Sequence, residues 1–238
     1  MARETMTLGQ AAEHVHIDAN ELKHVAQRGE IAAVERGGEW YFEHRDLDEW
    51  AQRRLIASSG KELGAVHRSM NDRDRREKKA EFRVASLFRS DGVTVALKSK
   101  TKGGAVRDMT DLAIATGLVY DDEGLFKELV DREEAAPTAV GNGCAFLHPR
   151  YHDPYFFEET FVAYGRTRRP IFFGAPDGEG TRHFFLVCST DHEKHLHILA
   201  RLAVLAHGTD LIERLDAAED EGAVLAAIEE CENEILNR

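Results

Sequence analysis

A charged stretch near the end of the first third of the chain constrains the fold most strongly. Residues 58–80 contain few apolar side chains, and acidic and basic residues alternate in Met70–Lys79. Such a segment cannot supply a hydrophobic core, so it is predicted to be a linker or an exposed helix. The chain must then fold as two separate parts. We place the first domain at residues 1–57, the basic linker or helix at 58–82 and the second domain at 83–238.

The net charge of −12 is distributed unevenly over these parts. Residues 1–50 hold 5 Lys and Arg against 11 Asp and Glu, residues 51–80 hold 9 against 4, and residues 81–238 hold 17 against 28. An acidic chain with one basic stretch can attract a polyanion only locally. Strong non-specific binding to nucleic acid is therefore not expected from the folded parts alone.

The chain carries no sign of membrane insertion or export. No apolar run approaches the roughly 20 residues that span a bilayer, and the N-terminus lacks the apolar segment of a signal peptide. The three cysteines, Cys144, Cys188 and Cys231, are far apart and show no paired ligand spacing. We therefore expect a cytoplasmic protein without a cofactor.

The histidines are not predicted to bind a metal. His183, His192, His195 and His197 lie close in the sequence, but no cysteine or carboxylate spacing completes a recognisable ligand set. The N-terminal histidines are interpreted as surface or partly buried residues rather than ligands; they are His14, His16, His24 and His44.

The first domain shows the pattern of a small winged helix-turn-helix. Thr7 and Asp18 are suitable helix N-caps, and Gly29 is a suitable helix end. The pair Gly37-Gly38 is a strong hairpin signal between two short apolar runs. The expected elements are a helix from Leu8 to Val15, a helix over Ala19–Arg28, strands over Ile31–Arg36 and Glu39–Glu43, and a helix from Asp46 through Leu55.

The second domain interleaves strands with helices over about 155 residues, which predicts an α/β sandwich around one sheet. The expected strands are Val93–Leu97, Phe161–Tyr164 and Phe184–Cys188. The expected helices are Lys102–Thr116, Asp122–Arg132, Lys194–Ala206, Leu211–Ala217 and Glu221–Leu236.

His148 is the candidate reactive residue, because it follows a glycine-rich turn. Glycines at Gly141 and Gly143 flank Asn142, and such turns let backbone N–H groups approach an oxyanion. A neutral imidazole is a good nucleophile near pH 7. This pattern predicts a phosphoryl acceptor, with a loop histidine that packs its ring against neighbours as the alternative.

The wider context resembles a known family. Arg132-Glu-Glu134, Pro137–Gly143 and Cys144–His148 occur in the order found in type-2 enzyme IIA domains of the phosphoenolpyruvate-dependent phosphotransferase system. Asp191–Ala203 is similar to that family's histidine-bearing helix, and Ile171–Asp177 also follows the family's order. The resemblance covers roughly residues 85–236 and implies a mixed sheet in the sandwich.

This resemblance assigns roles to four residues. It implies that His148 accepts the phosphoryl group and that His195 orients or stabilises it. Arg132 and Arg150 would pair with phosphate oxygens, and a helix C-terminal charge is the alternative for Arg132. The family usually has proline before the histidine and glycine after it, where this chain has Leu147 and Pro149. Pro149 removes one backbone N–H, so slower transfer, a different donor or loss of phosphorylation stay open.

The first domain resembles the excisionase or MerR-type helix-turn-helix over residues 5–55. Arg28-Gly-Glu-Ile31, the hairpin and Asp46–Trp50 carry the likeness. It implies that the second helix enters the major groove. The residues expected to face bases are Asn20, Lys23, His24 and Gln27, with Arg28 and Arg36 near phosphates. Because the domain is acidic, a protein-interaction or dimerisation module is the alternative.

Together these features predict a phosphotransferase-system regulator rather than a stand-alone metabolic enzyme. A histidine phosphocarrier protein would donate to His148, and the added charge would modulate DNA binding and transcription. A homodimer would bring two weak DNA half-sites together. The alternatives are an enzyme IIA phosphocarrier of sugar transport and a degenerate sensor that is not phosphorylated.

Overall fold

The computed structural model describes residues 5–15, 17–57, 82–149 and 156–237. Residues 58–81 of the predicted linker or helix at 58–82, and the predicted site residue Arg150, lie outside these ranges. Residue contacts divide the chain into two compact units, Met1–Glu81 and Phe82–Arg238. Each unit is described by itself.

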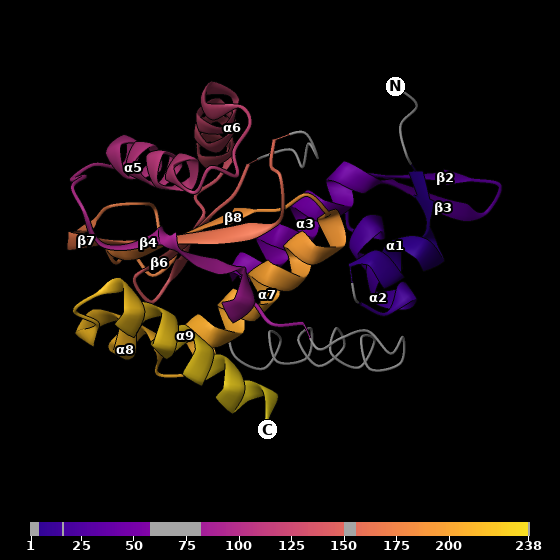
Figure 1. The fold of residues 1–238 in the computed structure, drawn as a ribbon. Coiled ribbons are helices and arrows are strands. Elements are labelled where there is room, and N and C mark those ends of the chain that lie inside the picture. The colour runs from indigo at the N-terminus through magenta and orange to yellow at the C-terminus, as the bar shows by residue number, and fades with distance from the viewer. Residues whose placement is uncertain (1–4, 16, 58–81, 150–155, 238) are drawn as a thin grey trace. The chain divides into compact units, whose positions relative to one another are not determined.

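The described residues of the small unit form the helices α1, α2 and α3 and a three-stranded antiparallel sheet with the strand order β1-β3-β2 (Figure 1). The predicted order of elements is present, with one additional strand, β1, which is only three residues long. The elements are β1 Thr5–Thr7, α1 Leu8–His14, α2 Ala19–Gln27, β2 Ala33–Arg36, β3 Glu39–Glu43 and α3 His44–Ala57.

Local sequence signals explain where these elements begin and turn. The Thr7 side chain accepts a hydrogen bond from the Gln10 backbone, and the Gln10 side chain accepts one from the Thr7 backbone, which forms a capping box. Asp18 caps α2 through the Asn20 N–H at 2.8 Å. Gly37-Gly38 has φ values of 61° and 84°, the positive pair that a two-residue type I′ hairpin requires.

The large unit is built on a five-stranded mixed sheet with the strand order β4-β7-β8-β6-β5. The pairs β4/β7 and β6/β8 are parallel, whereas β7/β8 and β5/β6 are antiparallel. The strands are β4 Phe88–Leu97, β5 Ala139–Gly141, β6 Cys144–Leu147, β7 Phe161–Ile171 and β8 Thr181–Cys188.

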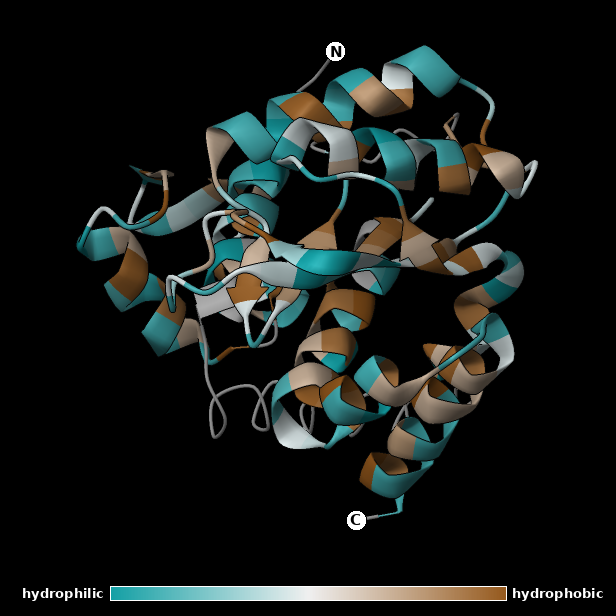
Figure 2. Ribbon diagram, turned by 90° about the vertical axis from the view of Figure 1, so that its left-hand side faces the viewer, coloured by the Kyte–Doolittle hydropathy of each residue, from teal (hydrophilic) through white to brown (hydrophobic). Residues whose placement is uncertain are grey.

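Helices cover both faces of this sheet, as predicted for an α/β sandwich (Figure 1). One face carries α5 Lys102–Ala115 and α6 Asp122–Ala135. The other carries α7 His192–Gly208, α8 Leu211–Ala217 and α9 Glu221–Leu236. Hydrophobic residues are concentrated in the sheet and on the helix sides that meet it (Figure 2). This burial supplies the main driving force for folding.

The alternation of side chains along β6 decides on which face of the sheet each of its residues lies. Ala145 and Leu147 belong to the core that α5 and α6 cover. Cys144 and Phe146 are equally buried and, by the two-residue period of a strand, point to the opposite face. Leu147, which departs from the family pattern, is therefore a core residue with 1% exposure.

A buried ion pair stabilises the first residues of the large unit. Arg201 Nη1 lies 3.1 Å from Glu232 Oε1, and both side chains are fully buried. The same carboxylate accepts hydrogen bonds from the Val84 and Ala85 backbones at 2.8 and 2.9 Å. Removing one partner of such a pair typically costs about 3–5 kcal/mol, because the other charge stays buried. These contacts join α7, α9 and the segment before β4.

Candidate functional site

His148 follows the last residue of β6 and continues the strand's alternation, so its ring lies on the face that α7 covers. The residue is 1% exposed. Its Nδ1 lies 2.8 Å from the Phe146 carbonyl oxygen, and its Nε2 accepts a 3.0 Å hydrogen bond from Arg132 Nε. Because arginine can only donate, Nε2 must carry a lone pair and Nδ1–H must donate to the carbonyl. The arrangement therefore selects a neutral imidazole with its free lone-pair nitrogen at Nε2 facing Arg132.

Arg132 reaches this nitrogen from the last turn of α6. Its Nη1 donates to the Ala136 carbonyl at 2.9 Å, and the residue is 5% exposed. The guanidinium thus caps the helix end, as one of the two interpretations expected, and it also contacts His148; its pairing with phosphate stays a prediction. A phosphoryl group on Nε2 would displace the Arg132–His148 hydrogen bond. Its oxygens would then lie beside the guanidinium, which favours charge-assisted hydrogen bonds.

His195 supplies the third side chain of the site. It lies in the first turn of α7, and its ring centroid is 5.1 Å from that of His148 at an interplanar angle of 62°. Like His148 it is 1% exposed. The positive end of a 17-residue helix therefore lies beside His148, which favours an anion there. His148, Arg132 and His195 are brought together; Arg150 lies outside the described residues.

The turn Gly141-Asn142-Gly143 has a different place from the one predicted. Gly141 pairs with Cys144, so Asn142 and Gly143 form the two-residue loop of the β5/β6 hairpin. Their φ values of 50° and 71° are the positive pair of a type I′ turn, for which Asn-Gly is the preferred sequence. The Asn142 N–H donates to Asp177 Oδ2 at 2.9 Å, and Asn142 Nδ2 donates to the Ala206 carbonyl at 2.7 Å.

The length of β6 and the length of α7 each indicate how far this turn lies from His148. His148 lies five residues beyond Gly143 on the extended chain, which is roughly 16 Å at about 3.3 Å per residue. Ala206, which holds the turn, lies eleven residues beyond His195 on α7, again roughly 16 Å at about 1.5 Å per residue. The predicted phosphate-binding role of Gly141, Asn142 and Gly143 therefore needs a correction. These three residues form the turn of the β5/β6 hairpin, and His148 lies at the opposite end of β6.

A second histidine, which the sequence did not single out for a site, lies at that far end. His183 Nδ1 is 2.8 Å from the Tyr164 hydroxyl, and its Nε2 is 3.4 Å from Asp216 Oδ1. Asp216 also pairs with Arg182 at 2.7 Å. Burial lowers the pKa of His183 to about 4, although Asp216 opposes this shift. His183 is thus a neutral, hydrogen-bonded residue of the interior.

The side chains predicted to meet DNA all lie on the surface of the small unit. Asn20, Lys23, His24, Gln27, Arg28 and Arg36 are exposed. The first four share one face of α2, since they are spaced by three and four residues. Nearby cations are already paired, because Arg28 lies 2.5 Å from Glu30 and Arg54 lies 2.6 Å from Glu21. Phosphate groups would have to compete with these exposed carboxylates.

Comparison with known proteins agrees with the division of the chain. Residues 86–231 match the family described as phosphoenolpyruvate-dependent sugar phosphotransferase system, EIIA 2, and the chain belongs to that family. Residues 5–55 match a helix-turn-helix domain family. Within the described residues, none of the helices combines the length and apolar character needed to cross a membrane.

Three similar proteins cover the large unit. A nitrogen regulatory protein of Bradyrhizobium diazoefficiens is 29% identical over 148 residues, which are 61% of this chain and 94% of that protein. The crystal structure of nitrogen regulatory protein IIA-Ntr from Neisseria meningitidis has a TM-score of 0.55 at 22% identity, over 61% of this chain and 98% of that one. Enzyme IIAMTL in its complex with phosphorylated enzyme IIBMTL from Escherichia coli has a TM-score of 0.53 at 21% identity, over 60% and 99%. At these identities the two structures establish the fold.

Proposed function

We propose that this chain is a phosphorylation-responsive regulator of the phosphotransferase system. His148 accepts a phosphoryl group from a histidine phosphocarrier protein, and the modified large unit modulates DNA binding by the small one. The observation that carries the proposal is the neutral His148 ring, held with its Nε2 lone pair against the Arg132 guanidinium and beside His195.

The transfer uses the residues in a defined order. The Nε2 lone pair of His148 forms the new bond to phosphorus, and the nitrogen–phosphorus bond of the donor breaks, returning its electron pair to the donor ring. Arg132 shifts its hydrogen bond from Nε2 to phosphate oxygens as charge arrives there. The Phe146 carbonyl keeps the Nδ1 proton and the ring orientation throughout.

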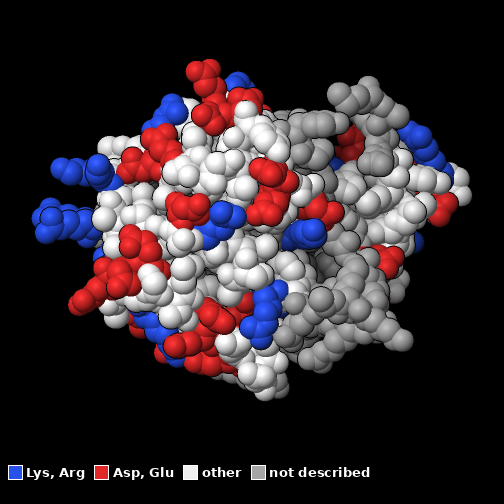
Figure 3. Space-filling view, viewed as in Figure 1, with Lys and Arg blue, Asp and Glu red and all other residues white. Residues whose placement is uncertain are grey.

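The regulatory step follows from charge. A phosphoryl group adds nearly two negative charges, and residues 81–238 already contain 28 acidic against 17 basic residues. On the face in view, side chains of both signs are interspersed over the large unit (Figure 3). Phosphorylation therefore raises the repulsion between this chain and a DNA backbone, which is the simplest way to couple the two units.

A labelling experiment tests the acceptor. The full chain is incubated with labelled phosphoenolpyruvate, the general phosphotransfer enzymes and the phosphocarrier protein. We expect an acid-labile phosphate on the wild type and on His183→Gln, and none on His148→Ala. An unlabelled wild type would overturn the proposal and favour the degenerate sensor, since Pro149 offers no N–H beside the acceptor.

A mobility-shift experiment tests the regulatory output. Genomic DNA fragments are titrated with the phosphorylated and unphosphorylated chain at several salt concentrations. We expect weaker binding after phosphorylation, with the difference shrinking as salt is raised. Identical binding in both states would leave no support for regulation through DNA.

The phosphocarrier function is the second candidate, because one structural neighbour is in complex with a phosphorylated enzyme IIB. Adding an enzyme IIB to the labelled chain separates the two functions. Rapid passage of label from His148 to enzyme IIB would favour the carrier, whereas retained label with altered DNA binding would favour the regulator.

A further inference from the structure

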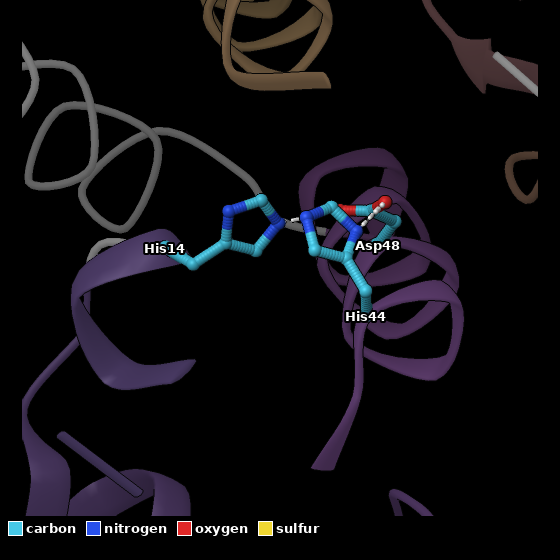
Figure 4. A group of neighbouring side chains, drawn as sticks. All are labelled: His14, His44 and Asp48. Atoms are coloured by element: carbon cyan, nitrogen blue, oxygen red, sulfur yellow. Dashed lines mark hydrogen bonds and ion pairs between the residues drawn. The ribbon is translucent and has the colours of Figure 1, made fainter. Parts of the chain in front are cut away.

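Three potential ligands from two helices meet in the small unit (Figure 4). His14 is the last residue of α1, His44 is the first residue of α3, and Asp48 lies one turn further along α3. His14 Nε2 is 2.6 Å from Asp48 Oδ1, and His44 Nδ1 is 3.1 Å from Asp48 Oδ2. The two imidazole centroids are 4.4 Å apart. One carboxylate is thus held between two imidazole nitrogens.

We propose that His14, His44 and Asp48 form a binding site for a divalent first-row transition metal such as Zn²⁺. One ligand atom from each residue lies within 4.8 Å of the other two. Bonds of about 2.0–2.1 Å in a tetrahedral zinc site place ligand atoms roughly 3.3 Å apart, so rotation of the side chains completes the geometry. Two imidazoles and one carboxylate leave a fourth position for water.

The spacing of these residues explains both the site and why the sequence did not predict it. His44 and Asp48 lie four residues apart on α3, the separation at which one helix face presents two ligands to the same ion. His14 lies 30 residues earlier and joins them only in the folded unit. The sequence analysis interpreted His14 and His44 as surface or partly buried residues rather than ligands.

The cluster is largely buried but still accessible from solvent. The side chains of His14, His44 and Asp48 are 10%, 21% and 7% exposed. A carboxylate largely removed from water gains strongly from a cation placed directly against it. The partly exposed His44 ring gives an ion a route from solvent.

An ion at this site would join the first and third helices of the helix-turn-helix unit. It would also place two positive charges in a segment whose first 50 residues hold 11 acidic and 5 basic side chains. Zinc should therefore stabilise the small unit, since a ligand that binds only the folded state shifts the unfolding equilibrium. This effect involves none of the residues around His148 and does not depend on phosphorylation.

Calorimetric titration of the chelator-treated full chain with Zn²⁺ tests the site. We expect a Zn²⁺ equivalent whose Kd rises at least about tenfold in His14→Gln, in His44→Gln and in Asp48→Asn, since even changes behind the ligands weaken metal sites by about 10–100-fold. Glu49→Gln is the matched control, because it removes an exposed carboxylate from the neighbouring position of α3. Its Zn²⁺ affinity should equal that of the wild type.

Co²⁺ gives a second readout that does not depend on heat signals. The wild type and Glu49→Gln should show the visible absorption of tetrahedral Co²⁺, and Asp48→Asn should lose it. Circular dichroism without metal identifies any variant that fails to fold, and such a variant is replaced by its partners in the set. Absence of Zn²⁺ binding to the wild type, or equal binding by the wild type and all folded ligand variants, would overturn the proposal and leave the cluster as a hydrogen-bonded His–Asp–His contact.

Discussion

A buried histidine lies near each end of β6, on the face of the sheet that α7 covers: His148 directly follows the strand, and His183 lies on the neighbouring strand β8. At one end, His148 directs Nε2 toward Arg132, a permanent donor that attracts anions. At the other, His183 lies opposite Cys144 and places its nitrogens against the Tyr164 hydroxyl and the Asp216 carboxylate. At the first end a guanidinium lies directly against the ring Nε2, whereas at the second the Asp216 carboxylate lies there and is itself paired with Arg182. Burial is common to both histidines, so the group beside Nε2 is what distinguishes them.

The dipole of α7 reinforces this difference. His195 lies in the first turn of the helix beside His148, where the unpaired N–H groups create a positive end. The Ala206 carbonyl lies in the last turn and accepts from Asn142 of the hairpin. The positive end of α7 thus lies beside His148, and a carbonyl at its negative end accepts a hydrogen bond from Asn142 of the hairpin turn.

The largest effect is expected from removing the guanidinium that lies beside His148. Arg132→Met should slow labelling of His148 by about 100–1000-fold, the usual effect of losing one donor that stabilises developing charge. Arg182→Met is the matched control, because Arg182 pairs with Asp216 at the other end. Initial rates of labelling by the phosphocarrier protein measure both. An unchanged rate in Arg132→Met, or an equal loss in the control, would contradict the assignment.

Much of the fold could be predicted from local signals. The limits of α8 and α9 are those expected from their apolar spacing, and the Gly37-Gly38 hairpin follows from a turn that needs two positive φ angles. The short strands β1, β5 and β6 were not predicted, because three or four residues give too little alternation to recognise. In addition, β1 and β6 pair with strands distant in the sequence, β3 and β8.

The candidate site shows where sequence reasoning fails. Gly141-Asn142-Gly143 contains two signals, a glycine-rich anion loop and an Asn-Gly hairpin turn, and only the second describes its geometry. The contact between Arg132 and His148 follows the order of family motifs, whereas the contact between His183 and Asp216 joins residues 33 positions apart with no local pattern. Side chains that meet through tertiary packing leave little trace in one sequence.

His183 is expected to affect how the stability of the protein depends on pH, and not the labelling of His148. The native pKa of His183 is about 4, below its ordinary value of 6.5, because burial favours the neutral ring. Between pH 6.5 and 4 the unfolded chain binds a proton that the native chain refuses, so stability falls with decreasing pH by up to about 3 kcal/mol. Denaturant unfolding at several pH values, compared with His183→Gln, isolates this contribution. Parallel pH profiles for the two proteins would rule it out.

A smaller effect is expected from the hairpin glycine. Gly143 has φ +71°, and an added Cβ would meet only ordinary contacts, the nearest being His183 Cδ2 at 3.8 Å. Gly143→Ala should therefore lose about 1–2 kcal/mol through the left-handed backbone alone. Gly103→Ala is the control, since Gly103 lies in α5 with open space around it, and alanine there should be neutral or stabilising. Denaturation midpoints compare the two; equal losses would mean that backbone strain is not the cause.

The smallest expected change in stability comes from Asn142→Gly, and it distinguishes the role of the hairpin turn from that of His148. Asn142→Gly keeps a residue that adopts positive φ readily and retains the N–H that faces Asp177, but it removes the side-chain hydrogen bond to Ala206. We expect a loss of about 0.5–1.5 kcal/mol in unfolding free energy and no change in the labelling rate of His148. If the turn contributed to phosphate binding through its side chain, the rate would fall together with stability. Because roughly 16 Å of strand separates the turn from the acceptor, a loss of stability with an unchanged rate is the outcome that the geometry requires.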